Sequence, residues 1–211
     1  MMSVAIFAKA PIPGFAKTRL SPAIGAESAA RLQEWLLVRT VETVFRSGLG
    51  PVSLWCAPGS GHPFFGALAE RYRIRLHDQG GDDLGDRMLG AFRAQTDARP
   101  LLLIGTDCPS LEATHLQAAA RALELGSDAV FLPAEDGGYV LVGLRRPVPE
   151  LFRQMPWGSD RVMEETRHRM RRTGMSWSEP ATLWDVDRPE DIARLDGDLL
   201  AALAASENVP V

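Results

Sequence analysis

Three basic side chains follow the first apolar stretch of the chain. Lys9, Lys17 and Arg19 lie in the segment FAKAPIPGFAKTRL, which continues the apolar residues VAIF. Gly14 lets the backbone approach a ligand closely, and two prolines stiffen the segment. Lysine, arginine and backbone N–H donors suit the oxygens of a phosphate chain. We therefore predict a phosphate-binding loop, with a solvated loop that carries chance cations as the alternative.

The two common glycine-rich phosphate motifs do not account for this loop. A Walker A sequence needs glycine directly before the lysine, whereas Ala16 precedes Lys17. The G-x-G-x-x-G dinucleotide pattern is also absent from the sequence. The loop is therefore not predicted to be a P-loop.

An aspartate stands just beyond another apolar run. Asp107 follows the residues LLLI in the segment IGTDCPSL, with Thr106 beside it. A carboxylate in this position is a suitable Mg²⁺ ligand in a phosphate site. The alternative is a helix cap, but Ser110 is itself a good N-cap residue and would leave Asp107 free. We predict that Asp107 binds metal.

A second acidic segment reads PAEDGGYVLVGL. Glu135 and Asp136 precede Gly137 and Gly138, and the pair D-G favours a hairpin turn. The turn and a binding role are compatible, because the two glycines would let an acceptor lie against the loop backbone. Glu135 would then hold a ligand hydroxyl or assist the metal.

A third acidic segment, LWDVDRPED, lies late in the chain. Asp185 and Asp187 are two residues apart, so on an extended segment they face the same side. One of them could supply a second metal carboxylate. The alternative is an N-cap before Pro189, for which Arg188 and Asp187 fit about equally well.

The segment QGGDDLGDRM, residues 79–88, is a candidate nucleotide-binding loop. A helix that begins near Leu84 would offer free backbone N–H groups. With Gln79, these groups could read the edge of a nucleobase, and Gly85 and Arg87 are further candidates in the same segment. The alternative is a plain surface turn.

Short apolar runs alternate with helical patterns, and these elements must position the loops. Strands are predicted at residues 3–8, 51–57, 73–77, 100–105, 128–134 and 139–144. Helices are predicted at residues 27–46, 63–71, 84–96, 111–125 and 159–172, and a last one after Pro189. This alternation predicts an α/β fold with a mostly parallel mixed sheet and helices on both faces. Ligands of such sheets bind beyond the carboxyl ends of the strands.

Composition narrows the class of protein. The 211 residues include 23 Lys and Arg and 27 Asp and Glu, and a net charge of −4 argues against binding nucleic acid by bulk charge. Cys56 and Cys108 form no C-x-x-C pair, which fits a reducing compartment. No apolar run approaches the roughly 18 residues of a membrane span, and the apolar N-terminal stretch is too short for a signal peptide.

These features predict a cytoplasmic protein that partners neither nucleic acid nor membrane. We expect one domain over residues 1–211, with a flexible tail from about residue 205. The oligomeric state is left open, because no heptad pattern or exposed apolar helix is evident.

Taken together, the motifs resemble a known family. The five segments above and PWGSDRV look like the glycosyltransferase-like family related to 2-phospho-lactate guanylyltransferase, within the nucleotide-diphospho-sugar transferase superfamily; the match runs from Val4 to about Ile192. The resemblance implies a Rossmann-like, GT-A-type fold. It implies nucleotide phosphates on Lys17 and Arg19, metal on Asp107 and Asp187, and a loop from residue 135 to 138 that faces the acceptor.

One departure from the superfamily bears on the reaction. Asp107 is followed by Cys108 and Pro109, so the D-x-D motif of sugar transferases is reduced to a single acid. We therefore expect a Mg²⁺-dependent (or Mn²⁺-dependent) nucleotidyltransferase. It would join a nucleoside monophosphate from a nucleoside triphosphate to a small phosphorylated acceptor and release pyrophosphate. The alternatives are a glycosyltransferase that uses a nucleotide-diphospho sugar and a non-catalytic nucleotide-binding protein.

Overall fold

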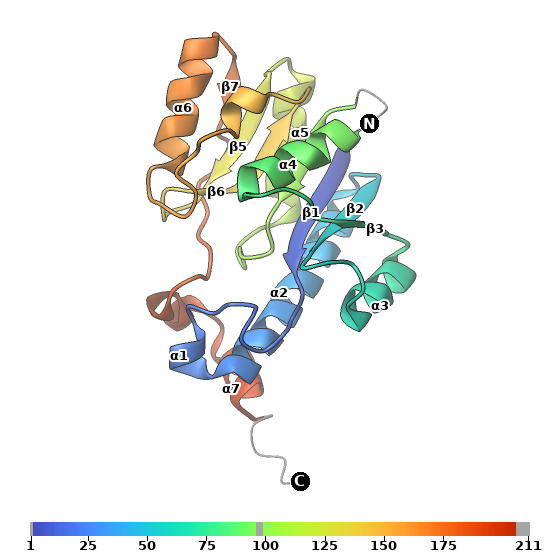
Figure 1. Cartoon of the computed structure of the whole chain (residues 1–211), viewed down its shortest axis with the longest axis vertical. Coiled ribbons are helices and arrows are strands. Elements are labelled where there is room, and N and C mark those ends of the chain that lie inside the picture. Colours follow the sequence, from blue (N-terminus) through green and yellow to red (C-terminus); the bar gives the residue numbers. More distant parts are fainter. Residues whose placement is uncertain (1, 96–98, 206–211) are drawn as a thin grey trace.

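The computed structural model describes residues 2–95 and 99–205. In these residues one sheet of seven strands has the order β3-β2-β1-β4-β6-β5-β7 (Figure 1). Neighbours in β3-β2-β1-β4 are parallel, β6 is antiparallel to both β4 and β5, and β7 is parallel to β5. The predicted α/β fold with a mostly parallel mixed sheet is confirmed. The strands are β1 (Ser3–Lys9), β2 (Val52–Ala57), β3 (Arg75–Asp78), β4 (Leu101–Ile104), β5 (Ala129–Pro133), β6 (Tyr139–Leu144) and β7 (Trp177–Ser178).

The helices lie close to their predicted positions. Three short elements were not predicted: α1, the 3-10 helix η1 and strand β7. The stretch after Pro189 is first a 3-10 helix, because the extended backbone of Leu195 interrupts the helical path before α7 begins. The predicted tail from about residue 205 falls almost wholly on residues 206–211, outside the described part. The helices are α1 (Ser21–Ile24), α2 (Ala26–Ser47), α3 (Pro63–Tyr72), α4 (Leu84–Ala94), α5 (Ala113–Glu124), α6 (Val162–Thr173), α7 (Gly197–Ala205), and the 3-10 segments η1 (Pro149–Leu151) and η2 (Pro189–Arg194).

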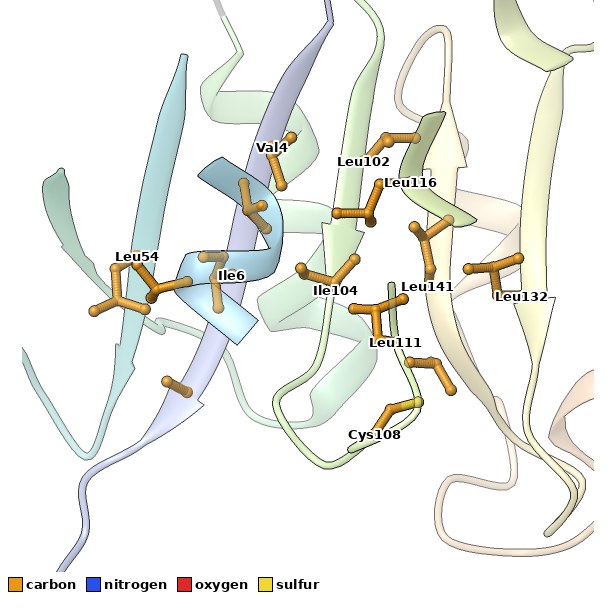
Figure 2. Packing of buried hydrophobic residues seen from close by; sticks show 14 of the residues in the cluster. Val4, Ile6, Leu54, Leu102, Ile104, Cys108, Leu111, Leu116, Leu132 and Leu141 are labelled. Atoms are coloured by element: carbon orange, nitrogen blue, oxygen red, sulfur yellow. The ribbon is translucent and has the colours of Figure 1, made fainter. Parts of the chain in front are cut away.

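Both faces of the sheet are packed, which explains why its central strands are continuously apolar. Because successive side chains of a strand point to opposite faces, Val4 and Ile6 of β1 join the cluster beside α2 and α5, whereas Ala5 and Phe7 join the cluster beside α4. Figure 2 shows the first cluster, where Ile6 of β1 and Ile104 of β4 lie among labelled side chains of β2, β5, β6 and α5. These two layers fix the strand ends rigidly.

A third apolar cluster joins distant parts of the chain. Leu20 of the first loop and Leu36 of α2 pack with Val186, Leu195 and Leu203 of the C-terminal segment. In Figure 1, α1 and α7 accordingly lie together beyond the arrowhead of β1. This packing holds residues 184–195 against the carboxyl edge of the sheet, by which we mean the edge where β1–β4 end.

No helix within residues 2–95 and 99–205 is long and apolar enough to cross a membrane.

Candidate functional site

Lys17 is the buried centre of the first loop. Its backbone has a φ of 50°, and its side chain is only 2% exposed. The ammonium forms an ion pair with Asp107 Oδ1 at 2.6 Å and donates to the carbonyl of Val186 at 2.6 Å. This differs from the predicted role, in which the ammonium was to meet a phosphate. The structure instead uses it to link the loop after β1 to the loop after β4.

Arg19 makes the second ion pair of the loop. One of its terminal nitrogens lies 2.6 Å from Asp187 Oδ2, and both side chains are open to solvent. The backbone N–H of Val186 in turn donates to the carbonyl of Asp107 at 2.8 Å. The four residues predicted for phosphate and metal therefore converge on one site. They contact each other directly, whereas the sequence placed a polyphosphate between cations and acids.

Two predicted candidates of the first loop remain open to solvent. Lys9 and Gly14 are both exposed, and Gly14 has a φ of 76°. In the loop after β4, Thr106 is buried and accepts from the amide of Gln33 at 3.1 Å. Ser110 is not the N-cap of the next helix as predicted, because α5 begins two residues later, with Glu112 as its cap. Asp107 is thus not used by α5.

A hollow of about 510 Å³ lies beside these ion pairs. Its lining carries far more acidic than basic side chains. The acids are Glu135, Asp136, Asp160, Asp185, Asp187, Glu190 and Asp191, against the arginines at 188 and 194. We call this hollow the acidic cavity; it suits cations and hydroxyl donors.

Asp185 lies in this cavity, and its pKa is raised. Burial first, and then the nearby charges of Asp136, Asp107 and Asp187, together raise the pKa of its carboxyl to about 6. In the described residues no arginine or lysine forms an ion pair with Asp185. Two aspartates were predicted as candidates for the second metal ligand. Asp187 is paired with Arg19, whereas Asp185 has no ion pair among the described residues.

The donor set suits a hard divalent cation without forming a closed cage. Within the described ranges no three His, Cys, Asp or Glu side chains converge tightly enough to hold a metal ion. Mg²⁺ usually binds through one or two carboxylates and completes its shell with water and substrate phosphates. The surplus negative charge in the lining favours a cation, so the residues fit such an ion when phosphate oxygens accompany it.

The acceptor loop is built differently from the prediction. Asp136 accepts from the N–H of Gly138 at 2.8 Å, which forms the expected turn. On its Cβ side Gly137 leaves no room for a ligand: with φ at 91°, a Cβ there would lie 2.0 Å from the carbonyl oxygen of Asp160. The protein's own backbone fills that space, and Gly137 also accepts from the N–H of Met163 at 2.8 Å. The side chains of the loop, rather than its glycines, face the acidic cavity.

Glu135 is tied to the C-terminal segment. It forms an ion pair with Arg194 at 2.6 Å, and the guanidinium of Arg194 lies 4.3 Å from the centre of the Trp184 ring. Arg194 and the backbone of Val186 were not predicted as site residues. No local motif marks them, because their roles depend on the packing of residues 184–195 against the sheet.

The segment 79–88 is mostly engaged in internal contacts. The Gln79 side-chain amide donates to the carbonyls of Trp55 and Ala8 at 2.8 and 3.3 Å, which leaves its oxygen as the group that could meet a base. Arg87 donates to the carbonyl of Gly81 at 3.3 Å. At Gly85, a Cβ would lie 2.4 Å from a backbone oxygen of the loop after η1, so this glycine packs internally rather than facing a ligand.

The first turn of α4 is likewise occupied. The carboxylate of Asp83 caps the helix by accepting from the N–H of Asp86 at 2.8 Å. The free N–H groups expected for a nucleobase are therefore partly used by the helix cap. Asp83 was in the predicted segment, but its capping role was not.

Solved structures share this fold over most or all of their length. The chain is 27% identical to a protein from Desulfovibrio desulfuricans G20 that is provisionally described as a nucleotide-diphospho-sugar transferase; the match covers 99% of both chains with a TM-score of 0.80. A nucleotidyl transferase from a Methanothermobacter species is 15% identical with a TM-score of 0.63 over 96% and 99% of the two chains. A glucosyl-3-phosphoglycerate synthase from Mycobacterium tuberculosis is 11% identical with a TM-score of 0.55, over 100% of this chain and 81% of that one; it was solved with Mn²⁺, UDP and glucosyl-3-phosphoglycerate.

These neighbours define the structural class, and a family model defines the membership. The neighbours are named transferases, which is the enzyme class predicted from the sequence, and the fold is that of the nucleotide-diphospho-sugar transferases. A family model described as "Uncharacterized protein conserved in bacteria (DUF2064)" matches residues 40–159, and the chain belongs to this family. No curated protein matched the chain. The narrower relation to 2-phospho-lactate guanylyltransferase stays a prediction.

Proposed function

We propose that the protein is a nucleotidyltransferase that needs Mg²⁺ or Mn²⁺. It transfers a nucleoside monophosphate from a nucleoside triphosphate to a small phosphorylated acceptor and releases pyrophosphate. The observation that carries this proposal is the convergence of Lys17, Arg19, Asp107 and Asp187 at the carboxyl edge of the sheet. The likeness in fold to a nucleotidyl transferase supports it.

In this proposal the basic residues have different roles. Lys9 and Arg19 are exposed and bind the β- and γ-phosphates, which depart as pyrophosphate. Lys17 is buried, so it acts as a positioning residue that fixes the carboxylate of Asp107. Gln79 lies at the end of β1 and β2 and offers its side-chain oxygen to the base.

Asp107 and Asp187 would hold the divalent ion together with phosphate oxygens. The bound ion would supply neutralisation of the charge on the α-phosphate and the departing phosphates. The acceptor phosphate is already anionic at neutral pH, so its attack on the α-phosphate requires no general base. Catalysis by the protein then rests on alignment and on fixed positive charge.

The acidic cavity would receive the acceptor. Carboxylates accept hydrogen bonds and donate none when ionised, so Glu135 and Asp136 suit hydroxyl groups of the acceptor. The acceptor phosphate would have to lie towards Arg188 or the metal, since the rest of the lining is mostly acidic. A small polyhydroxylated monophosphate meets both demands.

Glycosyl transfer from a nucleotide-diphospho sugar is the second candidate. The structure at 27% identity carries that description, although provisionally. The two reactions leave different products. Nucleotidyl transfer consumes a triphosphate and yields pyrophosphate, whereas glycosyl transfer yields a nucleoside diphosphate.

A thermal-shift panel of nucleoside triphosphates and nucleotide sugars, each with and without Mg²⁺, tests the proposal. A ligand at 100 times its dissociation constant should stabilise the fold by about 2.7 kcal/mol. We expect a triphosphate with Mg²⁺ to stabilise the protein, and Asp107→Asn to lose the Mg²⁺-dependent part. Arg121→Ala, which changes an exposed residue of α5, is the matched control.

The nucleotide that stabilises the protein most is then incubated with the protein and sugar monophosphates, and both pyrophosphate and nucleoside diphosphate are measured. Pyrophosphate release supports the first candidate. Release of nucleoside diphosphate from a nucleotide sugar replaces it with the second, and a panel in which no nucleotide stabilises the protein contradicts both.

A further inference from the structure

A second hollow lies at the opposite edge of the sheet. Its volume is about 600 Å³, within the usual range for small-molecule sites. The first residues of the parallel strands β1–β4 contribute to its lining, which places it at the amino edge. We call it the edge groove, with a floor of Ser53, Trp55, Arg75 and His77 and a wall that includes Ala91 and Gln95.

The floor of the edge groove is sheet rather than loop. Ser53 pairs in register with Arg75, and Trp55 with His77, so these four side chains lie on one face of β2 and β3. The same face carries Ala5 and Phe7 of β1, which pack under α4. The helix therefore covers β1 and stops short of β2 and β3, and this leaves part of the sheet as a rigid open shelf.

The shelf is aromatic, and its rings are stacked on one another. The rings of Trp55 and His77 stack with centroids 4.7 Å apart and planes only 14° apart. Phe7 continues the stack, with its ring centre 5.9 Å from that of Trp55. Trp55 and His77 are each half-buried, and because their faces are turned towards each other, it is mainly the ring edges that line the groove. Such edges contact the face of another aromatic ring.

The shelf is also cationic. Arg73 and Arg75 line the groove, both are exposed, and no ion pair or hydrogen bond engages either guanidinium among the described residues. The described lining contains no carboxylate. This contrasts with Lys17, Arg19 and Arg194, each of which is paired with an acid. A guanidinium fork binds a carboxylate through two parallel hydrogen bonds.

We propose that the edge groove is a second ligand site, which binds a small planar aromatic carboxylate with its ring against the edges of the Trp55–His77 pair and its carboxylate on Arg75. The ring edges favour the face of an aromatic ligand, and the unpaired guanidiniums select negative charge. Arg75 begins β3, whereas the ion pairs of the proposed nucleotide site lie at the carboxyl edge, so the two sites use different charged residues. Gln79, the proposed base contact, lies nearer to the groove, because its side chain binds the backbone of Trp55. The test of the groove does not depend on any reaction.

Three matched probes separate charge from shape in isothermal titration calorimetry. They are 2-naphthoate, the neutral 2-naphthylmethanol and the non-aromatic cyclohexanecarboxylate. We expect 2-naphthoate to bind at least tenfold more tightly than either of the others. Arg75→Ala should weaken 2-naphthoate binding about tenfold, and His77→Ala should weaken it several-fold, while both variants keep the wild-type melting temperature within a few degrees.

Two controls place the binding event. Arg121→Ala and Asp107→Asn should leave the affinity for 2-naphthoate unchanged. Equal affinity for all three probes would overturn the proposal, as would an affinity that Asp107→Asn lowers and Arg75→Ala does not. Sedimentation velocity adds a third check: a dimer that excludes 2-naphthoate and dissociates in Arg75→Ala would show that a second copy covers the groove, which also overturns the proposal.

Discussion

The two hollows of this protein are similar in size and opposite in charge. The acidic cavity of about 510 Å³ lies near Lys17, Arg19 and Arg194, each of which is paired with an acid, whereas the described lining of the edge groove of about 600 Å³ presents unpaired arginines and no carboxylate. At the carboxyl edge, ion pairs between distant segments build the site. At the amino edge, the sheet forms the floor and α4 contributes a wall. The buried, paired Lys17 therefore acts mainly as scaffold, whereas exposed cations are available to ligands.

The largest expected effect is on turnover at the carboxyl edge. Asp107→Ala should reduce the rate of the proposed nucleotidyl transfer roughly 10²–10³-fold, the scale for loss of one electrostatic contact to the transition state. Pyrophosphate release under saturating nucleotide and Mg²⁺ measures it. A near-normal rate would remove Asp107 from the mechanism and leave the Lys17 pair as scaffold alone.

Replacement of Gly137 should destabilise the loop that lines the acidic cavity. In Gly137→Ala the new Cβ would lie 2.0 Å from the carbonyl oxygen of Asp160 at a positive φ, so we expect a loss of about 3 kcal/mol in unfolding free energy. Gly14→Ala is the matched control. It also has a positive φ but meets nothing within 4 Å, and should lose only about 1 kcal/mol in urea denaturation. Equal losses would show that the Asp160 contact is unimportant.

The two ion pairs of the first loop should contribute differently to the unfolding free energy. Asp107→Asn leaves the buried ammonium of Lys17 without its counter-ion, and should destabilise the fold by about 2 kcal/mol, below the full value for buried pairs because Asp107 is half exposed. Asp187→Asn breaks a pair that is open to solvent and should lose less than about 1 kcal/mol. The urea midpoints of the two variants measure this difference. A larger loss of stability in Asp187→Asn than in Asp107→Asn would contradict the scaffold role of Lys17.

The acidic cavity should leave a signature in the pH dependence of stability. The folded pKa of Asp185, about 6, lies above its ordinary value of 3.8, so ionisation of this carboxyl disfavours the fold and stability falls as pH rises from about 4 to about 6. Asp185→Asn should therefore stabilise the protein at pH 7.5 by about 1 kcal/mol, reduced for partial solvent exposure, and have no such effect at pH 3.5. Thermal unfolding in EDTA measures this, and a gain that is equal at both pH values would exclude titration as its cause.

The smallest expected effect belongs to the amino edge. Arg75→Ala should change the unfolding free energy by less than about 0.5 kcal/mol, since the guanidinium has no ion pair or hydrogen bond in the part of the chain that the structure describes. Its replacement should instead affect only ligand binding. A loss of stability comparable to that of Asp107→Asn would show that Arg75, like Asp107, stabilises the fold, and would contradict the difference between the two edges.

The order of strands and helices followed from the sequence because its signals are local. Continuous apolar runs mark buried strands, and the spacing of Leu37, Val41 and Val44 marks the buried side of α2. The 3-10 helix after Pro189 and the two-residue β7 were missed because each depends on contacts with distant segments. Proline at a first turn fits a 3-10 helix as well as an α-helix.

The identities of the site residues were easier to predict than their partners. The end of a parallel strand places Asp107 at the ligand edge, and this follows from topology alone. That Lys17 would turn inward to Asp107 and Val186, and that Gly137 would serve Asp160 rather than an acceptor, requires knowledge of how residues 184–195 and 158–163 pack. The edge groove could not be predicted either, since its openness depends on where α4 stops relative to β2 and β3.

The contacts of residues 184–195 with the first loop also set an order of events during synthesis. Asp107 and Lys17 leave the ribosome long before Val186, which binds the backbone of the one and the side chain of the other. A nascent chain that ends before this segment has the strands and both loops but lacks the residues that lock them together. The growing polypeptide would therefore be unable to complete the proposed nucleotide site until translation has passed the final 3-10 turn.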